Sequence, residues 1–273
     1  MTKGSFLTAG DQALGNEFLE AGFVVRPCES PTTLDTLRQS ILQGANNWLR
    51  SHDIDTTITD LGNSHLSIPK NLINDIRLHL FANLNTDPLI RREYFDLAAS
   101  LLQGLVGNEL AMQNKVNLSI QQPHDETSVL ELHSDVWTGD SPFQVVLWVP
   151  LTDSTASNAM FFVSPKKSRE AYSRAIAGEL RSMGEIQKAY ASHLKPIEIR
   201  YGDILIFDSS CFHGNQINTT SHSRWSLNCR LTSLLAPSTT PERRLGPYYT
   251  PIMVRPATLM GLLAIDNLGT TEQ

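Results

Sequence analysis

Polar and apolar residues alternate strictly over residues 223–231, where the sequence reads Ser-Arg-Trp-Ser-Leu-Asn-Cys-Arg-Leu. Because successive side chains of an extended chain point to opposite faces, a period of two predicts a β-strand with one apolar and one polar face. The polar face carries Arg224, Ser226, Asn228 and Arg230. An arginine that faces the inside of a sheet is costly to bury without an anion, so this strand is expected to bind a carboxylate.

A second alternation occupies residues 112–119. Its polar set, which is expected to face either a pocket or solvent, consists of Gln113, Lys115, Asn117 and Ser119. Runs rich in valine, isoleucine and aromatic residues predict further strands at 21–25, 143–151 and 159–163, and a strand, a turn and a second strand at 195–207.

Helical spacing of apolar residues appears mainly in the first part of the chain. Helices are predicted at 11–20, 31–50, 71–84, 88–105 and 168–191, the last with Gly178 and Gly184 as weak points. Residues 51–70 are polar and irregular, which favours a surface loop over a mobile lid. The helices are expected to cover a sheet, so the fold class is mainly β with flanking helices.

The length of 273 residues, 41% of them hydrophobic, suits one domain with a substantial core. We expect a helical part at about 1–110, a β core at about 111–236 and a tail at 237–273 whose structure the pattern does not define. No internal repeat or linker interrupts this organisation.

Charge and targeting features exclude several classes of function. The net charge of −6 argues against a nucleic-acid partner. No apolar run approaches the ~20 residues that span a bilayer, and the first residues lack the pattern of a secretory signal. The three cysteines show no metal or redox spacing, so a cytoplasmic location is expected.

A candidate metal site begins with His133 and Asp135, which point the same way if the chain is extended. A His-x-Asp triplet alone is weak evidence, because the chain has 8 histidines and 28 acidic residues. His213, which follows the apolar run 204–207, is the candidate third ligand. Two imidazoles and one carboxylate leave one side of a metal open, as in non-haem Fe(II) oxygenases, whereas structural zinc takes four ligands. His124 has no partner at ligand spacing and is expected at the surface.

With these residues the chain resembles the Fe(II)/2-oxoglutarate-dependent dioxygenases, and among them the phytanoyl-CoA-hydroxylase-like branch. The resemblance covers roughly residues 110–235. It rests on His133, Asp135 and His213, and on Arg224, which lies eleven residues after the distal histidine and begins an Arg-Trp-Ser sequence. The sequence around these residues is most similar to that of oxygenases from carbohydrate and aminoglycoside biosynthesis clusters.

The resemblance implies a double-stranded β-helix, or jelly roll, that binds Fe(II) through the triad and uses O2 and 2-oxoglutarate as cosubstrates. It also implies that Arg224, with Ser226, holds the C5 carboxylate of 2-oxoglutarate, with Arg230 as the fallback and Asn117 as a second contact. Such enzymes oxidise an unactivated carbon of a small molecule. Because halogenating relatives lack the carboxylate ligand, Asp135 favours hydroxylation, desaturation or ring formation.

Two alternative functions fit parts of the pattern. A cupin-like metalloenzyme without 2-oxoglutarate could use the same triad, but it would leave Arg224 unexplained. A non-catalytic jelly-roll binding protein would not need the triad and Arg224 together.

The substrate is expected to be small and hydrophilic, of a sugar or aminocyclitol type. The hypothesis includes substrates of this type that carry a phosphate or a nucleotide. Trp137 lies two residues after Asp135, so on an extended chain it would form a pocket wall, although a core position explains it equally well. Arginines and tyrosines in the tail would suit such a substrate if the tail covers the pocket, and otherwise they form a solvated face. These tail residues are Arg243, Arg244, Tyr248, Tyr249 and Arg255.

Overall fold

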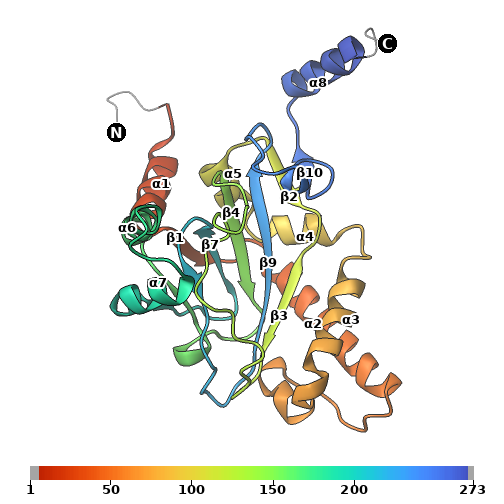
Figure 1. Ribbon diagram of the computed structural model, residues 1–273. Helices are drawn as coiled ribbons and strands as arrows, with labels where there is room; N and C mark the ends of the chain where they lie inside the picture. Colours follow the sequence, from red (N-terminus) through yellow and green to blue (C-terminus); the bar gives the residue numbers. More distant parts are fainter. Residues whose placement is uncertain (1–5, 270–273) are drawn as a thin grey trace.

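The computed structural model describes residues 6–269, and within them two antiparallel sheets form the centre of the molecule (Figure 1). The larger sheet has the strand order β1-β7-β4-β9-β2-β10, and β3 also pairs with β9. The smaller sheet has the order β6-β5-β8. The strands of the larger sheet are β1 (Phe23–Pro27), β2 (Leu110–Gln113), β3 (Asn117–Gln121), β4 (Gln144–Pro150), β7 (Asp203–Asp208), β9 (Arg224–Ser233) and β10 (Tyr249–Met253). Those of the smaller sheet are β5 (Met160–Phe162), β6 (Lys195–Ile197) and β8 (His213–Gly214).

Strand β9 is the long central strand. β4 pairs with it on one side, while β2 and β3 pair with its two halves on the other side. The predicted strand at 112–119 is therefore two strands. Between them, the Asn85 side chain donates to the carbonyl of Val116 and accepts from its amide, both at 2.9 Å. This side chain replaces the ladder hydrogen bonds that Val116 lacks.

The two faces of the larger sheet differ in what covers them. Helices pack on the outer face, where the predicted apolar side chains of β9 are completely buried; these are Trp225, Leu227, Cys229 and Leu231. The inner face turns toward the smaller sheet, and a second apolar cluster that includes Trp148 and Phe207 lies there. Because both faces are covered, β4 is buried along its whole length.

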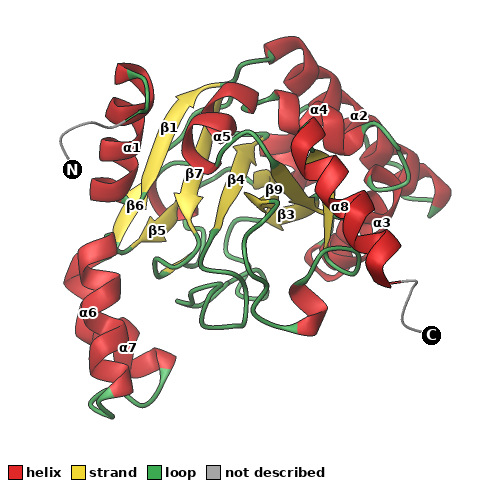
Figure 2. Cartoon of the chain, turned by 90° about the horizontal axis from the view of Figure 1, so that it is seen from above, coloured by secondary structure: helices red, strands yellow, loops and turns green. Residues whose placement is uncertain are grey.

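The outer helices come from the first part of the chain and lie along one side of the molecule (Figure 2). They are α1 (Ala9–Ala21), α2 (Pro31–Ser51), α3 (Ile73–Leu84), α4 (Ile90–Asp96) and α5 (Ala99–Val106). The single helix expected at 88–105 is two helices, because the Glu29 carboxylate accepts from the backbone amides of Ser100 and Leu101 and so caps α5. The segment 51–70 is not simply an irregular loop: it contains the 3₁₀ helix η1 (Leu61–Leu66), and Leu61 and Ile68 are buried.

The helical segment after β5 is also divided. It forms α6 (Pro165–Ile176) and α7 (Met183–Tyr190), with a break at Gly178, whose φ of 76° is accessible to glycine. The tail adds β10 to the edge of the larger sheet, and α8 (Pro256–Gly269) then projects away from the body (Figure 1). No helix in the described part of the chain is long and apolar enough to cross a membrane.

Candidate active site

The structure brings the predicted triad together on the inner side of the larger sheet. The backbones of His133 and His213 form a two-way β-bridge, with N to O distances of 2.9 and 2.8 Å. The possible ligand atoms of His133, Asp135 and His213 all lie within 4.8 Å of one another. Gly214 permits this close approach, because a Cβ atom there would lie 2.8 Å from the carbonyl oxygen of Leu130.

Hydrogen bonds set the orientation of both histidine rings. His133 Nδ1 lies 2.8 Å from the carbonyl oxygen of Glu131, and His213 Nδ1 lies 2.9 Å from that of Cys211. A carbonyl can only accept, so each neutral ring carries its proton on Nδ1 and leaves the Nε2 lone pair free. Burial lowers the pKa of His213 to about 4, which keeps that ring neutral near pH 7. Both rings are therefore prepared to bind a metal ion through Nε2.

Asp135 is buried and presents its two oxygens to different partners. Oδ1 lies 3.7 Å from His133 Nε2, while Oδ2 accepts from Arg230 Nε at 3.0 Å and lies 2.8 Å from Arg230 Nη2. Burial alone would raise the pKa of Asp135, but the nearby charge of Arg230 and the histidines outweigh it and lower the pKa. Asp135 is thus a carboxylate with one oxygen left for a metal ion.

Arg230 is the fallback candidate for binding 2-oxoglutarate, and its charge is already paired. Besides Asp135, its Nε lies 2.8 Å from Oδ2 of Asp140, which is also buried. Two carboxylates neutralise this guanidinium within the protein. That pairing argues against Arg230 as the residue that holds a cosubstrate.

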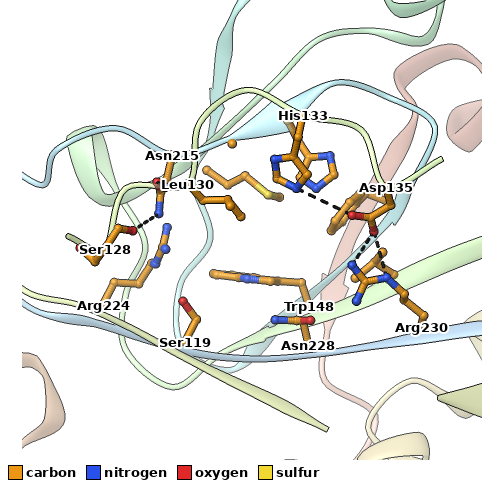
Figure 3. Close-up of a pocket in the computed structure, with 15 residues that line it drawn as sticks. Ser119, Ser128, Leu130, His133, Asp135, Trp148, Asn215, Arg224, Asn228 and Arg230 are labelled. Atoms are coloured by element: carbon orange, nitrogen blue, oxygen red, sulfur yellow. Dashed lines mark hydrogen bonds and ion pairs between the residues drawn. The ribbon is translucent and has the colours of Figure 1, made fainter. Parts of the chain in front are cut away.

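Arg224 lies at the opposite end of the cavity from His133 and Asp135, with Trp148 between them (Figure 3). Its side chain is buried, and Nη1 donates to the carbonyl of Asn158 at 2.8 Å. Its Nε has no hydrogen-bond partner, and no acidic side chain of residues 6–264 pairs with it. The Ser226 hydroxyl, on the same strand face, is also buried without a partner. Burial lowers the pKa of Arg224 to about 10, so the residue remains a cation at neutral pH.

One cavity connects Arg224 to the triad. The other lining residues are Ser119, Ser128, Leu130, Val146, Trp148, Met160, Phe207, Gly214, Asn215, Asn228 and Arg230. Ser119 and Asn228 lie on polar strand faces that the alternation predicted, so the sequence pattern could have indicated them. Ser128 and Asn215 come from two loops, joined by a 3.2 Å hydrogen bond, and no local pattern marks them.

The structure does not place Asn117 and Trp137 on the cavity wall. Asn117 donates to Asn228 Oδ1 at 3.2 Å, so Asn228, and not Asn117, faces the cavity. The chain turns after Asp135, with Thr138 N donating to its carbonyl at 3.1 Å. Trp137 therefore does not share the face of Asp135; its half-exposed ring stacks on Tyr172 at 5.2 Å. The expectation of an extended chain was wrong here, and the role of Trp137 in substrate binding stays a prediction.

The tail does not line this cavity among the described residues. Arg243 forms an ion pair with Asp140, with Nε 2.8 Å from Oδ1, and its guanidinium lies 4.2 Å from the centre of the Tyr248 ring. Tyr249 is buried and donates to the Gln144 side chain. Arg244 and Arg255 are exposed. The tail thus packs beside the site, and its strand and helix lead away from the cavity.

Comparison with known proteins agrees with this geometry. The profile of the phytanoyl-CoA dioxygenase (PhyH) family matches residues 18–226. That range covers well over half of the chain, so the protein belongs to this family. No protein among the curated sequences matches it.

Solved structures of the same fold cover nearly the whole chain at low sequence identity. ThoJ, a non-haem monooxygenase in complex with nickel, has a TM-score of 0.54 at 16% identity and covers 94% of each chain. SnoK, an α-ketoglutarate-dependent carbocyclase from nogalamycin biosynthesis, has a TM-score of 0.56 at 16% identity and covers 92% of this chain and 95% of its own. EctD from S. alaskensis has a TM-score of 0.55 at 16% identity, with coverages of 90% and 83%. These likenesses concern the fold.

Family membership assigns the class of enzyme. The protein is a non-haem oxygenase that depends on iron and 2-oxoglutarate. The donor set fits an iron ion: two imidazole nitrogens with free lone pairs and one carboxylate oxygen converge from one side. The buried, partly unsatisfied Arg224 fits the distal carboxylate of 2-oxoglutarate. Ser226, whose buried hydroxyl also lacks a partner, is on the same strand face but is not among the residues that line the cavity.

Proposed function

We propose that this enzyme hydroxylates, or otherwise oxidises, a small hydrophilic biosynthetic intermediate. His133, Asp135 and His213 hold one Fe(II) ion in this proposal, and Arg224 with Ser226 binds the C5 carboxylate of 2-oxoglutarate. The observation that carries the proposal is the buried guanidinium of Arg224, which lacks a carboxylate partner and lies across one cavity from the triad. A buried charge of this kind is costly unless an anion joins it.

The protein groups have distinct roles in this mechanism. When bound, iron and 2-oxoglutarate together with O2 supply the oxidant that attacks an unactivated carbon, and 2-oxoglutarate becomes succinate and carbon dioxide. The carbonyls of Glu131 and Cys211 hold the two imidazoles in the ligand tautomer. Arg230 fixes the rotation of the Asp135 carboxylate. Trp148, whose ring centre lies 6.0 Å from the guanidinium carbon of Arg224, forms the cavity wall between Arg224 and the triad.

We infer the architecture in its finer form as a double-stranded β-helix. Two antiparallel sheets that face each other, with the site on the inner face, support this assignment. We also infer one domain, because a single apolar cluster includes residues from α2 and α3 as well as from β4 and β9. Three free, buried cysteines support a cytoplasmic location.

For the substrate we propose a sugar or aminocyclitol type. Ser128, Asn215 and Asn228 give the cavity a polar side that suits hydroxyl groups, and its apolar side is formed by Leu130, Val146, Trp148, Met160 and Phe207. Arg243 is engaged with Asp140, so Arg244 and Arg255 are the tail arginines that remain for a phosphate on such a substrate. Hydroxylation, desaturation or ring formation is favoured over halogenation, because Asp135 occupies the position that halogenating relatives leave open.

Substrate-stimulated succinate release tests the proposal. Purified protein with Fe(II), O2 and 2-oxoglutarate is incubated with sugar phosphates, sugar nucleotides and aminocyclitols, and in parallel with acyl thioesters and free amino acids. We expect stimulation by the first set, and none in an Asp135→Ala control. Stimulation only by an acyl thioester or an amino acid would eliminate the carbohydrate substrate but keep the oxygenase. No succinate under any condition would contradict the use of 2-oxoglutarate.

A further inference from the structure

A chain of alternating charges runs from the tail to a proposed metal ligand. Arg243 Nε lies 2.8 Å from Asp140 Oδ1, and Arg230 Nε lies 2.8 Å from Asp140 Oδ2. Arg230 Nη2 in turn lies 2.8 Å from Asp135 Oδ2. Two cations and two anions thus form one connected group, and its last member is the carboxylate of the triad.

Asp140 is the central member of this group. It is only 2% exposed, so water cannot replace a lost partner. Its backbone amide donates to the carbonyl of Asp135 at 3.0 Å, which fixes the turn between the two acids. Gln144 donates to Asp140 at 3.3 Å and accepts from the Tyr249 hydroxyl, which ties the same group to the start of β10.

The arginines and Tyr249 lie outside the part of the chain that defines the family. The family profile ends at residue 226, whereas Arg230 lies in the second half of the central strand β9 and Arg243 and Tyr249 belong to the tail. The tail therefore contributes charge and a hydroxyl to a site whose proposed ligands all lie within the matched region.

We propose that Arg243 is a positioning residue for the metal site and acts through Asp140 and Arg230. Arg243 forms an ion pair with Oδ1 of Asp140, an oxygen that accepts no hydrogen bond. Asp140 then pairs with Arg230 through Oδ2, and Nη2 of Arg230 stays on Asp135. Asp135 then offers Oδ1 to the metal ion and Oδ2 to Arg230. This inference rests on the triad assignment of the proposed function.

The loss of Arg243 has a defined physical consequence. Asp140 would remain a buried carboxylate with Arg230 as its remaining cation, so Arg230 would be drawn toward Asp140 and away from Asp135. Asp135 would lose the contact that fixes its rotation. Changes to groups that orient a metal ligand typically lower metal affinity by about 10- to 100-fold. Because Arg243 acts through two other residues, Asp140 and Arg230, we expect the lower end of this range, a loss of metal affinity of about 10-fold.

The experiment measures metal affinity by calorimetry on the full-length protein, with Mn(II) as the probe. Arg243→Gln should raise the Kd for Mn(II) about 10-fold, and Arg243→Lys, which keeps a cation for Asp140, should recover part of the loss. Arg174→Gln is the matched control, because it breaks an exposed ion pair of 2.9 Å with Glu179 that includes no residue of the site. Its Kd should equal that of the wild type.

A double variant distinguishes an effect of Arg243 through Asp140 and Arg230 from a general loss of structure. If Arg243 acts through Asp140, Arg243→Gln should have no further effect on the Kd in an Asp140→Asn background. A Kd for Arg243→Gln within twofold of the wild type, or full additivity with Asp140→Asn, would overturn the inference. Asp135→Ala distinguishes the two proposals, since unchanged Mn(II) affinity in that variant would instead refute the triad itself.

Discussion

Replacing Arg224 with methionine should weaken 2-oxoglutarate binding and, at the same time, stabilise the protein without ligand. Methionine fills a similar apolar volume but brings no charge into the buried site. If Arg224 only supported the fold, the protein would lose stability when Arg224 is replaced. If the role of Arg224 is to bind an anion, its replacement should weaken 2-oxoglutarate binding and raise the stability of the ligand-free protein.

The structure sets the size of both effects. Burial lowers the pKa of Arg224 to about 10, and at about 1.4 kcal/mol per pH unit the unpaired charge costs the folded protein on the order of 3 kcal/mol. Its hydrogen bond to the Asn158 carbonyl returns ~1 kcal/mol, so the variant should gain about 2 kcal/mol. Loss of one partner from a buried charge pair costs about 2–5 kcal/mol, which raises the KM for 2-oxoglutarate by roughly 30-fold or more.

Two assays check this prediction. Urea unfolding without metal or 2-oxoglutarate measures the free energy of unfolding, and succinate formation at saturating Fe(II) gives the KM for 2-oxoglutarate. Arg230→Met is the comparison, because Arg230 contacts Asp135 and should change metal affinity more than the KM for 2-oxoglutarate. A KM for Arg224→Met within threefold of the wild type, or a larger rise in Arg230→Met, would refute the assignment.

Three further predictions concern the triad. Asp135→Ala should lose iron and turnover together, and an iron content equal to that of the wild type, measured by elemental analysis, would contradict its role. Burial lowers the pKa of His213 to about 4, whereas the unfolded chain binds that proton near pH 6.5, so the metal-free protein should lose up to about 3 kcal/mol of stability as the pH falls between these values. Urea titrations should show a flatter pH dependence for His213→Gln than for His65→Gln, whose pKa is also lowered by burial; equal curves would argue against this account. Gly214→Ala should abolish metal binding, because its Cβ would lie 2.8 and 2.9 Å from two backbone carbonyl oxygens, while Gly261→Ala, with open space around it, should bind metal normally in the same calorimetric assay.

The alternation at 223–231 predicted the most useful part of the site. Trp225 and its apolar companions do pack against the helices, and Arg224 and Asn228 do face the cavity. The alternation predicted both faces correctly because β9 is a central strand: one of its faces packs on the apolar cluster under the helices, and the other faces the polar cavity. The same alternation could not show that β2 and β3 are separate strands, since Asn85, distant in sequence, interrupts the ladder without changing the period.

The region around Asp135 shows where local pattern fails. The Gly139-Asp140 turn is visible in the sequence, but it begins already at Asp135, and this moves Trp137 onto Tyr172. The pairing of Arg230 with Asp135 and Asp140 joins residues about 90 positions apart. Such contacts depend on the three-dimensional arrangement, so the sequence could not distinguish Arg230 from Arg224 by anything except spacing to His213.

A crystal structure of the protein with Ni(II) and 2-oxoglutarate bound tests the central claim most directly. The account predicts one metal ion at roughly 2.0–2.2 Å from Nε2 of His133, Nε2 of His213 and Oδ1 of Asp135. It also predicts the C5 carboxylate of 2-oxoglutarate within hydrogen-bond distance of Arg224 Nε and the Ser226 hydroxyl. A metal ion held by other residues, or a C5 carboxylate that contacts Arg230 and leaves Arg224 unpaired, would contradict it.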